Sequence, residues 1–160
     1  MSRIKEVTSL PEESVYRTPS REEDEEEGRK SVERYQFLAE KLPLMIWTAG
    51  PDGKMTYANS CLREFCGSRM DADSDQWPAM MVHPNDIQRC APLWTASLQE
   101  GKAYEVELRI RRADDVYRWC ITRAAPQKDA LGRVLAWFGV TIDVHELKLA
   151  ALRNSSASSV

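Results

Sequence analysis

The last third of the chain constrains the fold most, because three strand-like segments follow one another there with turn residues between them. Residues 102–112, KAYEVELRIRR, alternate between apolar and charged side chains, which is the pattern of a strand with one buried face. The pair Asp114–Asp115 separates this segment from residues 116–126, and residues 129–132 separate those from residues 133–144. The spacing predicts a three-stranded antiparallel meander.

The final strand of this meander, RVLAWFGVTIDV, is almost free of charged side chains on both of its faces. A strand of this kind needs cover on both sides of the sheet. Helices between residues 59 and 98 can close one face around a concave chamber, and the helix around residues 31–42, or a second subunit, can cover the other. At Asp143 the strand passes into a helix-like segment with no glycine or proline between them.

A helix and a hairpin are predicted ahead of the meander. Apolar residues at three- and four-residue steps follow Ser31, a good N-cap residue, and Pro43 limits this helix. Residues 44–50 and 54–59 read as two short strands, which a tight turn at Asp52–Gly53 joins.

A longer helix is predicted between the hairpin and the meander. Pro84 suits its first turn, one apolar face runs from Ile87 to Leu98, and Gly101 breaks the pattern. Pro92 lies inside this helix and is expected to kink it.

Length and composition favour one domain with tails, since 160 residues with 42% hydrophobic content can bury the core of one ordinary domain. The expected organisation is a disordered acidic arm, a cap helix, one α+β domain, and the start of a linker helix with a polar tail: residues 1–30, 31–43, 44–144 and 145–160. The acidic run REEDEEEGRK fits a solubilising tail, and a contact with a basic partner is the alternative.

Charge, cysteine usage and hydropathy argue against several classes of protein. Residues 1–30 hold six basic and nine acidic side chains, so their net charge of 6 − 9 = −3 equals that of the whole chain and the rest is neutral. A neutral body without a basic stripe is not typical of nucleic-acid binding. The four cysteines form no CxxC pair, which indicates reduced thiols and no structural metal site. The absence of a long apolar run favours a cytoplasmic protein with no membrane partner.

Three segments together resemble a PAS domain, of the branch whose second half carries the PAC motif. They are WTAGPDGKMTYAN, then VHPNDIQRC at the start of the long helix, then YRWCITRAAPQKDALGRVLAWFGVTIDVHELK. The resemblance covers about residues 35 to 150. It implies a five-stranded antiparallel sheet in strand order 2-1-5-4-3, with helices around a cavity on one face and the N-terminal amphipathic helix on the other. It also implies a sensory module that reports to an output domain, often as a dimer and usually without enzyme activity.

The resemblance also bears on cofactors. Flavin-binding light sensors of the family carry a reactive cysteine where this chain has DADSDQWPAM, and amide side chains where it has Ile110, Cys120 and Thr141. Flavin photochemistry of that type is therefore not expected. Haem is not expected either, because His83 precedes the long helix and His145 follows the last strand. One departure from the family is Asp115, which stands where a turn glycine is usual.

Three sets of residues follow from this alignment. A mainly apolar or aromatic small molecule is expected against Trp94, Val106, Leu108, Ile110, Cys120, Thr122, Trp137 and Thr141, with a filled core as the alternative. A dimer or cap-helix interface is expected through Val32, Tyr35, Leu38, Trp119, Ile121, Phe138, Val140 and Ile142. Asp143 marks the expected point of signal transmission, where it can accept hydrogen bonds or cap the following helix.

The function favoured by the sequence is a sensory or protein-interaction module of a cytoplasmic signalling protein. Its expected partners are a second copy of the chain, an output domain or separate signalling protein, and a small-molecule ligand. One alternative is a structural dimerisation domain with a filled core and no ligand. The other is a small enzyme with Cys120 or Cys66 as nucleophile and His83 as base, but neither cysteine lies in a recognisable nucleophile motif.

Overall fold

A computed structural model describes residues 20–71 and 80–157 of the chain. The helices and strands follow the order in which the sequence predicts them. They are α1 (Arg21–Lys41), β1 (Met45–Ala49), β2 (Met55–Ala58), α2 (Ser60–Cys66), the short 3-10 helix η1 (Gly67–Asp71), α4 (Pro84–Glu100), β3 (Tyr104–Arg111), β4 (Tyr117–Lys128), β5 (Val134–Asp143) and α5 (His145–Ala157). The chain divides between Gln36 and Phe37 into two compact units, the second of which contains the whole sheet.

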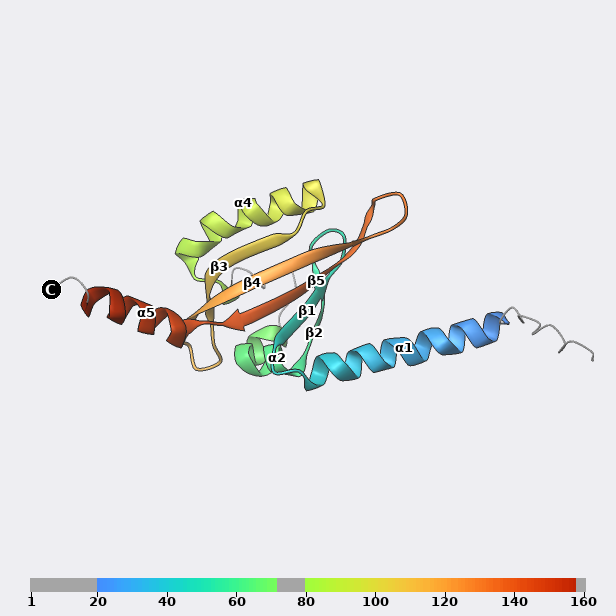
Figure 1. Cartoon of the computed structure of the whole chain (residues 1–160), viewed down its shortest axis with the longest axis horizontal. Helices are drawn as coiled ribbons and strands as arrows, with labels where there is room; N and C mark the ends of the chain where they lie inside the picture. Colours follow the sequence, from blue (N-terminus) through green and yellow to red (C-terminus); the bar gives the residue numbers. More distant parts are fainter. Residues whose placement is uncertain (1–19, 72–79, 158–160) are drawn as a thin grey trace, which may run out of the picture. The chain divides into compact units, whose positions relative to one another are not determined.

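The five strands form one antiparallel sheet in the order β2-β1-β5-β4-β3. This confirms the predicted strand order and the α+β class. The last strand of the chain, β5, lies in the middle of the sheet, where Gly139 pairs with Trp47 of β1 on one side and with Ala124 of β4 on the other. Figure 1 shows α4 running alongside β3 and α5 continuing from the end of β5.

Two tight turns each contain a residue with a positive φ. Gly53 has a φ of 83° in the β1–β2 hairpin, and the added Cβ of any other residue would also lie 2.8 Å from Leu98 of α4. Asp115 has a φ of 69° in the β3–β4 turn, a conformation that aspartate tolerates better than most residues. Its carboxylate forms ion pairs with Arg69 and Arg111, which hold the turn where the family usually has glycine.

Asn59 joins the end of α1 to the first strand and to α2. Its side-chain nitrogen donates to the carbonyl oxygens of Ala39 and Leu44 at 2.8 and 2.7 Å, and its side-chain oxygen accepts from the N–H groups of Ile46 and Leu62 at 3.0 and 3.1 Å. All the strong hydrogen-bonding positions of this fully buried amide are therefore used. The side chain acts both as the N-cap of α2 and as a bridge between elements.

Helix α1 begins at Arg21, whereas the sequence predicts a helix from residue 31 and a disordered arm before it. The residues between are helical because charged side chains one turn apart are paired. Arg21 and Glu25 lie 3.0 Å apart, and Lys30 and Glu26 lie 3.3 Å apart. Residues 1–19 of the predicted arm lie outside the described residues.

Two other helices are longer or more regular than the sequence predicts. Helix α5 runs through most of the predicted polar tail, and α4 is one continuous helix through Pro92.

The two faces of the sheet differ in their exposure. On the inner face of β5, Trp137, Gly139 and Thr141 are buried, whereas Phe138 and Ile142 on the outer face are 52% and 42% exposed. The other outer-face residues of the predicted interface, Trp119, Ile121 and Val140, are half-buried, and Val32, Tyr35 and Leu38 of α1 are exposed. The predicted dimer or cap-helix interface through these residues stays a prediction.

Candidate functional site

A cavity of about 230 Å³ lies between α4 and the inner face of the sheet. Every strand contributes to its wall, together with the β1–β2 turn and one face of α4. Its main side chains are Trp47, Met55, Val82, Ile87, Cys90, Ala91, Trp94, Thr95, Tyr104, Leu108, Ile110, Thr122 and Thr141. Among these described residues none is charged, so the wall is apolar and aromatic with a few neutral polar groups.

The aromatic part of the site is centred on Trp94 of α4. The ring of Trp94 meets those of Trp47, Tyr104 and Trp137 edge to face, with centroids 6.0, 5.1 and 5.0 Å apart. Trp137 is fully buried, and its indole nitrogen has no hydrogen-bond partner among the described residues. These contacts attach the helix that covers the cavity to β1, β3 and β5.

Trp47 reaches its position because the opposite residue on β5 is glycine. A Cβ built on Gly139 would lie 2.0 Å from Cε2 of the Trp47 indole, far closer than two carbon atoms can approach. The missing side chain lets the indole lie flat against the backbone of β5. The close packing there, and not a backbone conformation, is the reason for glycine at this position.

Two buried threonines and Trp47 form the polar part of the cavity wall. The indole nitrogen of Trp47 donates to Oγ1 of Thr141 at 3.2 Å, and Oγ1 of Thr141 lies 3.0 Å from Oγ1 of Thr122 on the neighbouring strand. Thr122 and Thr141 are directly opposite in the pairing of β4 with β5. The three groups therefore form one hydrogen-bonded chain across three strands.

The ionisable groups of the wall are held neutral. Burial raises the pKa of Tyr104 well above its ordinary range, and it also raises the pKa of Cys90. The two side chains are joined by a hydrogen bond. Neither group brings charge to the cavity at neutral pH.

The structure brings together some of the residues predicted for the cavity and leaves others outside it. Trp94, Leu108, Ile110, Thr122 and Thr141 line the cavity. The remaining three are buried in the core but are not part of the wall: Val106, Cys120 and Trp137.

The sequence analysis did not place Trp47, Met55 or Cys90 in the cavity. Cys90 could have been found, because it shares the apolar face of the long helix with Trp94. Trp47 could not, since its place depends on the pairing of β1 with β5.

A buried ion pair fixes the start of α4 to β3. The Asp86 carboxylate accepts from the Arg109 guanidinium at 2.9 and 3.1 Å and from the Arg109 backbone N–H at 2.9 Å. The side chain of Asp86 is only 7% exposed, and the Arg109 hydrogen bonds lower its pKa against the opposing effect of burial. The charged form of Asp86 is therefore the one that holds α4 against the sheet.

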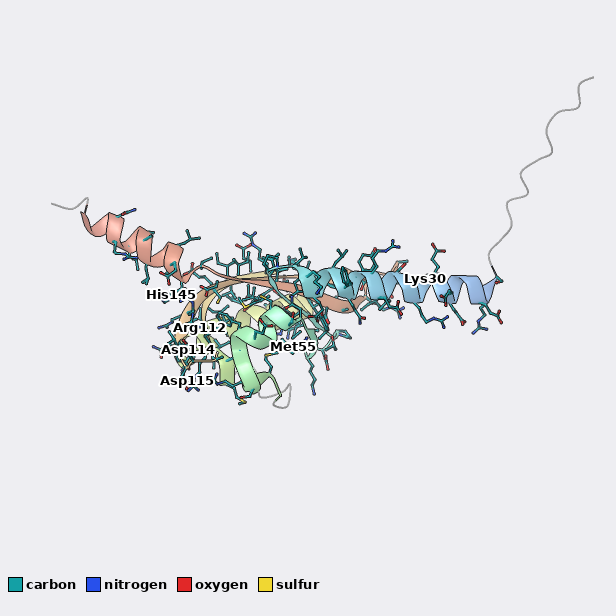
Figure 2. All side chains as sticks on the ribbon, turned by 90° about the horizontal axis from the view of Figure 1, so that it is seen from below. Lys30, Met55, Arg112, Asp114, Asp115 and His145 are labelled. Atoms are coloured by element: carbon teal, nitrogen blue, oxygen red, sulfur yellow. The ribbon has the colours of Figure 1, made fainter. Side chains whose placement is uncertain are left out.

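The exit from the sheet is built around Asp143, the last residue of β5. Its carboxylate accepts from the backbone N–H of His145 at 2.9 Å and from the Arg118 guanidinium, which also contacts Glu146 at 3.3 Å. The backbone N–H of Trp119 on β4 donates to Nδ1 of His145 at 3.2 Å. The imidazole therefore accepts the hydrogen bond that a backbone carbonyl would accept if β5 continued. Figure 2 shows His145 at the same end of the domain as the β3–β4 turn.

The ring of Trp119 links the side chains that contact α4 to those of α5. The Arg109 guanidinium lies 4.9 Å from the centre of its ring, and Nζ of Lys148 on α5 lies 3.9 Å from it. Lys148 also forms an ion pair with Glu107 of β3. The side chains of Asp86, Arg109, Trp119 and Lys148 thus connect α4 to α5 through continuous contacts.

The cysteines and histidine considered for catalysis do not form a catalytic pair. Cys66 and Cys120 are fully buried, and burial raises the pKa of each thiol to about 12, which favours the unreactive neutral form. His83 accepts a hydrogen bond from the Asn85 N–H and packs against Tyr117. In residues 20–71 and 80–157, moreover, acidic, cysteine and histidine side chains do not gather as a metal site requires.

Residues 63–141 match the family model described as the PAS fold. The chain contains a PAS domain. A peroxide stress-activated histidine kinase of Schizosaccharomyces pombe, mak1, is 34% identical over 126 residues, which is 78% of this chain and 8% of that protein. The chain therefore spans only a small part of this curated relative. A PAS domain of this kind is a sensory signalling module.

Solved structures have the same fold. An RNA-binding light-oxygen-voltage receptor matches with a TM-score of 0.65 at 17% identity, over 96% of this chain and 42% of that one. A sensory box histidine kinase/response regulator from Burkholderia thailandensis matches with a TM-score of 0.54 at 24% identity, over 78% of this chain and 96% of that one. Within the part of the PAS chain that the structure describes, the helices are too short or too polar to cross a bilayer.

Replacement of Gly139 by alanine is expected to destabilise the domain by about 2 kcal/mol, because the added methyl group must displace the Trp47 indole and break its hydrogen bond to Thr141. Urea unfolding measures the change. The control is Gly28→Ala in α1, where the added Cβ meets no atom within 4 Å. Equal stability of Gly139→Ala and the unchanged protein would contradict the packing role.

Asp86→Asn is expected to cost about 2 kcal/mol of unfolding free energy at pH 7, because the charged hydrogen bonds to Arg109 are lost. The pKa of Asp86 is lowered on folding, so its stabilisation is complete above the ordinary carboxyl range and is lost as the pH falls through the lowered value. The difference between the two proteins should therefore shrink below about pH 4. Glu64→Gln, at an exposed site, is the control, and a pH-independent difference would count against the ion pair.

Proposed function

We propose that this PAS domain is the ligand-sensing input of a cytoplasmic signalling protein and that it reports the state of its cavity through β5 and α5. The output domain, or a separate signalling partner, receives the change. The similarity to a peroxide stress-activated histidine kinase supports this class of output.

The cavity is the observation that carries the proposal. Its volume of about 230 Å³ exceeds the volume of about 150 Å³ at which an apolar cavity in another protein takes up benzene. An apolar wall with a few convergent polar groups is the usual form of a small-molecule site. The alternative function, a structural module with a filled core, predicts no cavity of this size.

The path from ligand to output is short. Thr141 lines the cavity, and Asp143, two residues further along β5, holds the first turn of α5. A ligand that moves β5 or α4 changes the contacts at Asp143 and Trp119. It can shift the position of α5 only by binding one arrangement of these groups more tightly than another.

The outer face of the sheet supports a dimer. Phe138 and Ile142 are exposed on the central strand, and Leu147 and Leu152 of α5 are 73% and 55% exposed. A second copy that covers these side chains would bring two α5 helices together, as a signalling coiled coil requires. In that arrangement the output is read as a change between two paired helices.

Ligand binding is tested by a thermal-shift screen with neutral aromatic and apolar compounds. A hit at about 100 times its Kd should stabilise the domain by roughly 2.7 kcal/mol and raise Tm by several degrees. Ala91→Phe adds a phenyl ring at a residue that lines the cavity and should abolish the shift. Ala96→Phe, on the same helix and also exposed but outside the wall, should keep it. No hit at all, or hits that survive Ala91→Phe, would favour the structural module.

Dimerisation is tested by sedimentation over a range of concentrations. The domain is expected to dimerise, and the pair Phe138→Glu and Ile142→Glu is expected to yield monomers because charge replaces exposed apolar surface. Leu131→Glu, at a more exposed apolar site in the β4–β5 turn, is the control. A monomer mass at every concentration would reject this part of the proposal.

A further inference from the structure

The hydroxyl groups of Thr122 and Thr141 have two hydrogens between them, and only one of these is donated in a hydrogen bond of the described structure. The contact between the two Oγ1 atoms takes one of the two hydroxyl hydrogens, whichever residue donates. Trp47 supplies a donor to Thr141 and no acceptor. Within residues 20–71 and 80–157 these are the hydrogen bonds that the two hydroxyls form, so one O–H has no acceptor among them.

The unused donor is buried and belongs to the cavity wall. Thr122 and Thr141 are 8% and 3% exposed, and both line the cavity. A buried donor without a partner costs free energy, so an acceptor that enters the cavity restores a bond the protein lacks. Of the other polar side chains of the wall, Thr95 donates to the carbonyl of Ala91, and Tyr104 bonds to Cys90.

The remaining features of the cavity limit the charge and shape of its ligand. The described wall residues carry no charge, so an ion would leave water without gaining a counter-charge. The rings of Trp47, Trp94 and Tyr104 offer edges and faces to another ring. The volume leaves room for one or two fused rings.

We infer that the cavity binds a neutral aromatic molecule of one or two rings that carries a hydrogen-bond acceptor, such as a carbonyl oxygen or a ring nitrogen, placed against the Thr122–Thr141 pair. The inference rests on the proposed function, in which the cavity is a ligand site. It adds the chemical class of the ligand and identifies the Thr122–Thr141 pair as the hydrogen-bond donor to the ligand's acceptor atom.

Three probes of nearly the same shape test the class. Quinoline has a ring-nitrogen acceptor and is neutral at pH 7.5, naphthalene lacks the acceptor, and N-methylquinolinium is charged and lacks it too. Quinoline is expected to bind about fivefold more tightly than naphthalene, the gain from one hydrogen bond, although naphthalene is the more hydrophobic. N-methylquinolinium is expected to bind at least tenfold more weakly than quinoline. Calorimetry of the full chain measures all three.

The position of the probe is read from the indole N–H signal of Trp47 in nitrogen-edited NMR spectra, assigned by its loss in Trp47→Phe. Quinoline should shift this signal, because it bonds to the same threonine pair, and Ala91→Phe should abolish the shift while Ala96→Phe keeps it.

The outcomes separate the two claims. If naphthalene binds more tightly than quinoline, the claim that the ligand carries a hydrogen-bond acceptor is wrong, while the cavity is still a ligand site. N-methylquinolinium binding as tightly as quinoline would overturn the neutral class in favour of an aromatic cation site. Failure of all three probes to bind would overturn this inference, and the proposed function falls with it only if the wider thermal-shift screen also has no hit.

Discussion

The central position of β5 is the constraint on which the rest of the structure depends. The strand is hydrogen-bonded on both sides, to β1 and to β4, although it is the last strand of the chain. Its inner face carries Trp137, Gly139 and Thr141, and its end carries Asp143. One strand holds the packing site of Trp47, a polar group of the cavity and the cap of α5. Any change in the position of β5 therefore alters the contacts at all three sites.

Charge is distributed in the domain according to this arrangement. The cavity wall is neutral among the described residues, and burial keeps Tyr104 and Cys90 uncharged. Ion pairs gather instead at the edges of the cavity and at the exit, where Asp86 meets Arg109 and Arg118 meets Asp143. Half-buried pairs of this kind depend strongly on geometry, since each charge is stable there only with its partner in place.

Two connections between cavity and exit run in parallel. One follows the backbone of β5 from Thr141 to Asp143. The other passes through side chains, from Asp86 on α4 through Arg109 and the ring of Trp119 to Lys148 on α5. In the proposed function, the first connection responds to a ligand that touches the sheet and the second to a ligand that moves α4. The cation–aromatic contacts in the second are worth about 1 kcal/mol each, which is enough to bias an equilibrium without locking it.

By itself the sequence determined the features that depend on local pattern. Alternation in residues 102–112 marks β3, and the nearly uncharged run at residues 133–144 marks β5. Asp52–Gly53 and Asp114–Asp115 mark the turns, and the apolar face from Ile87 to Leu98 marks α4. The start of α1 was misplaced because charge pairs one turn apart outweighed the polar composition that suggests disorder. Family resemblance supplied the strand order, which no local pattern contains.

Only the tertiary structure decided which buried residues face the cavity. Val106 and Trp137 share the apolar pattern of residues that line it, yet they lie in the packed core around it. The hydrogen bond from Trp47 to Thr141 joins residues 94 positions apart, and the contact of Trp47 with Gly139 spans the same two strands. Periodicity assigns a side chain to a face of a strand, whereas the cavity depends on the volumes of side chains that distant segments bring together.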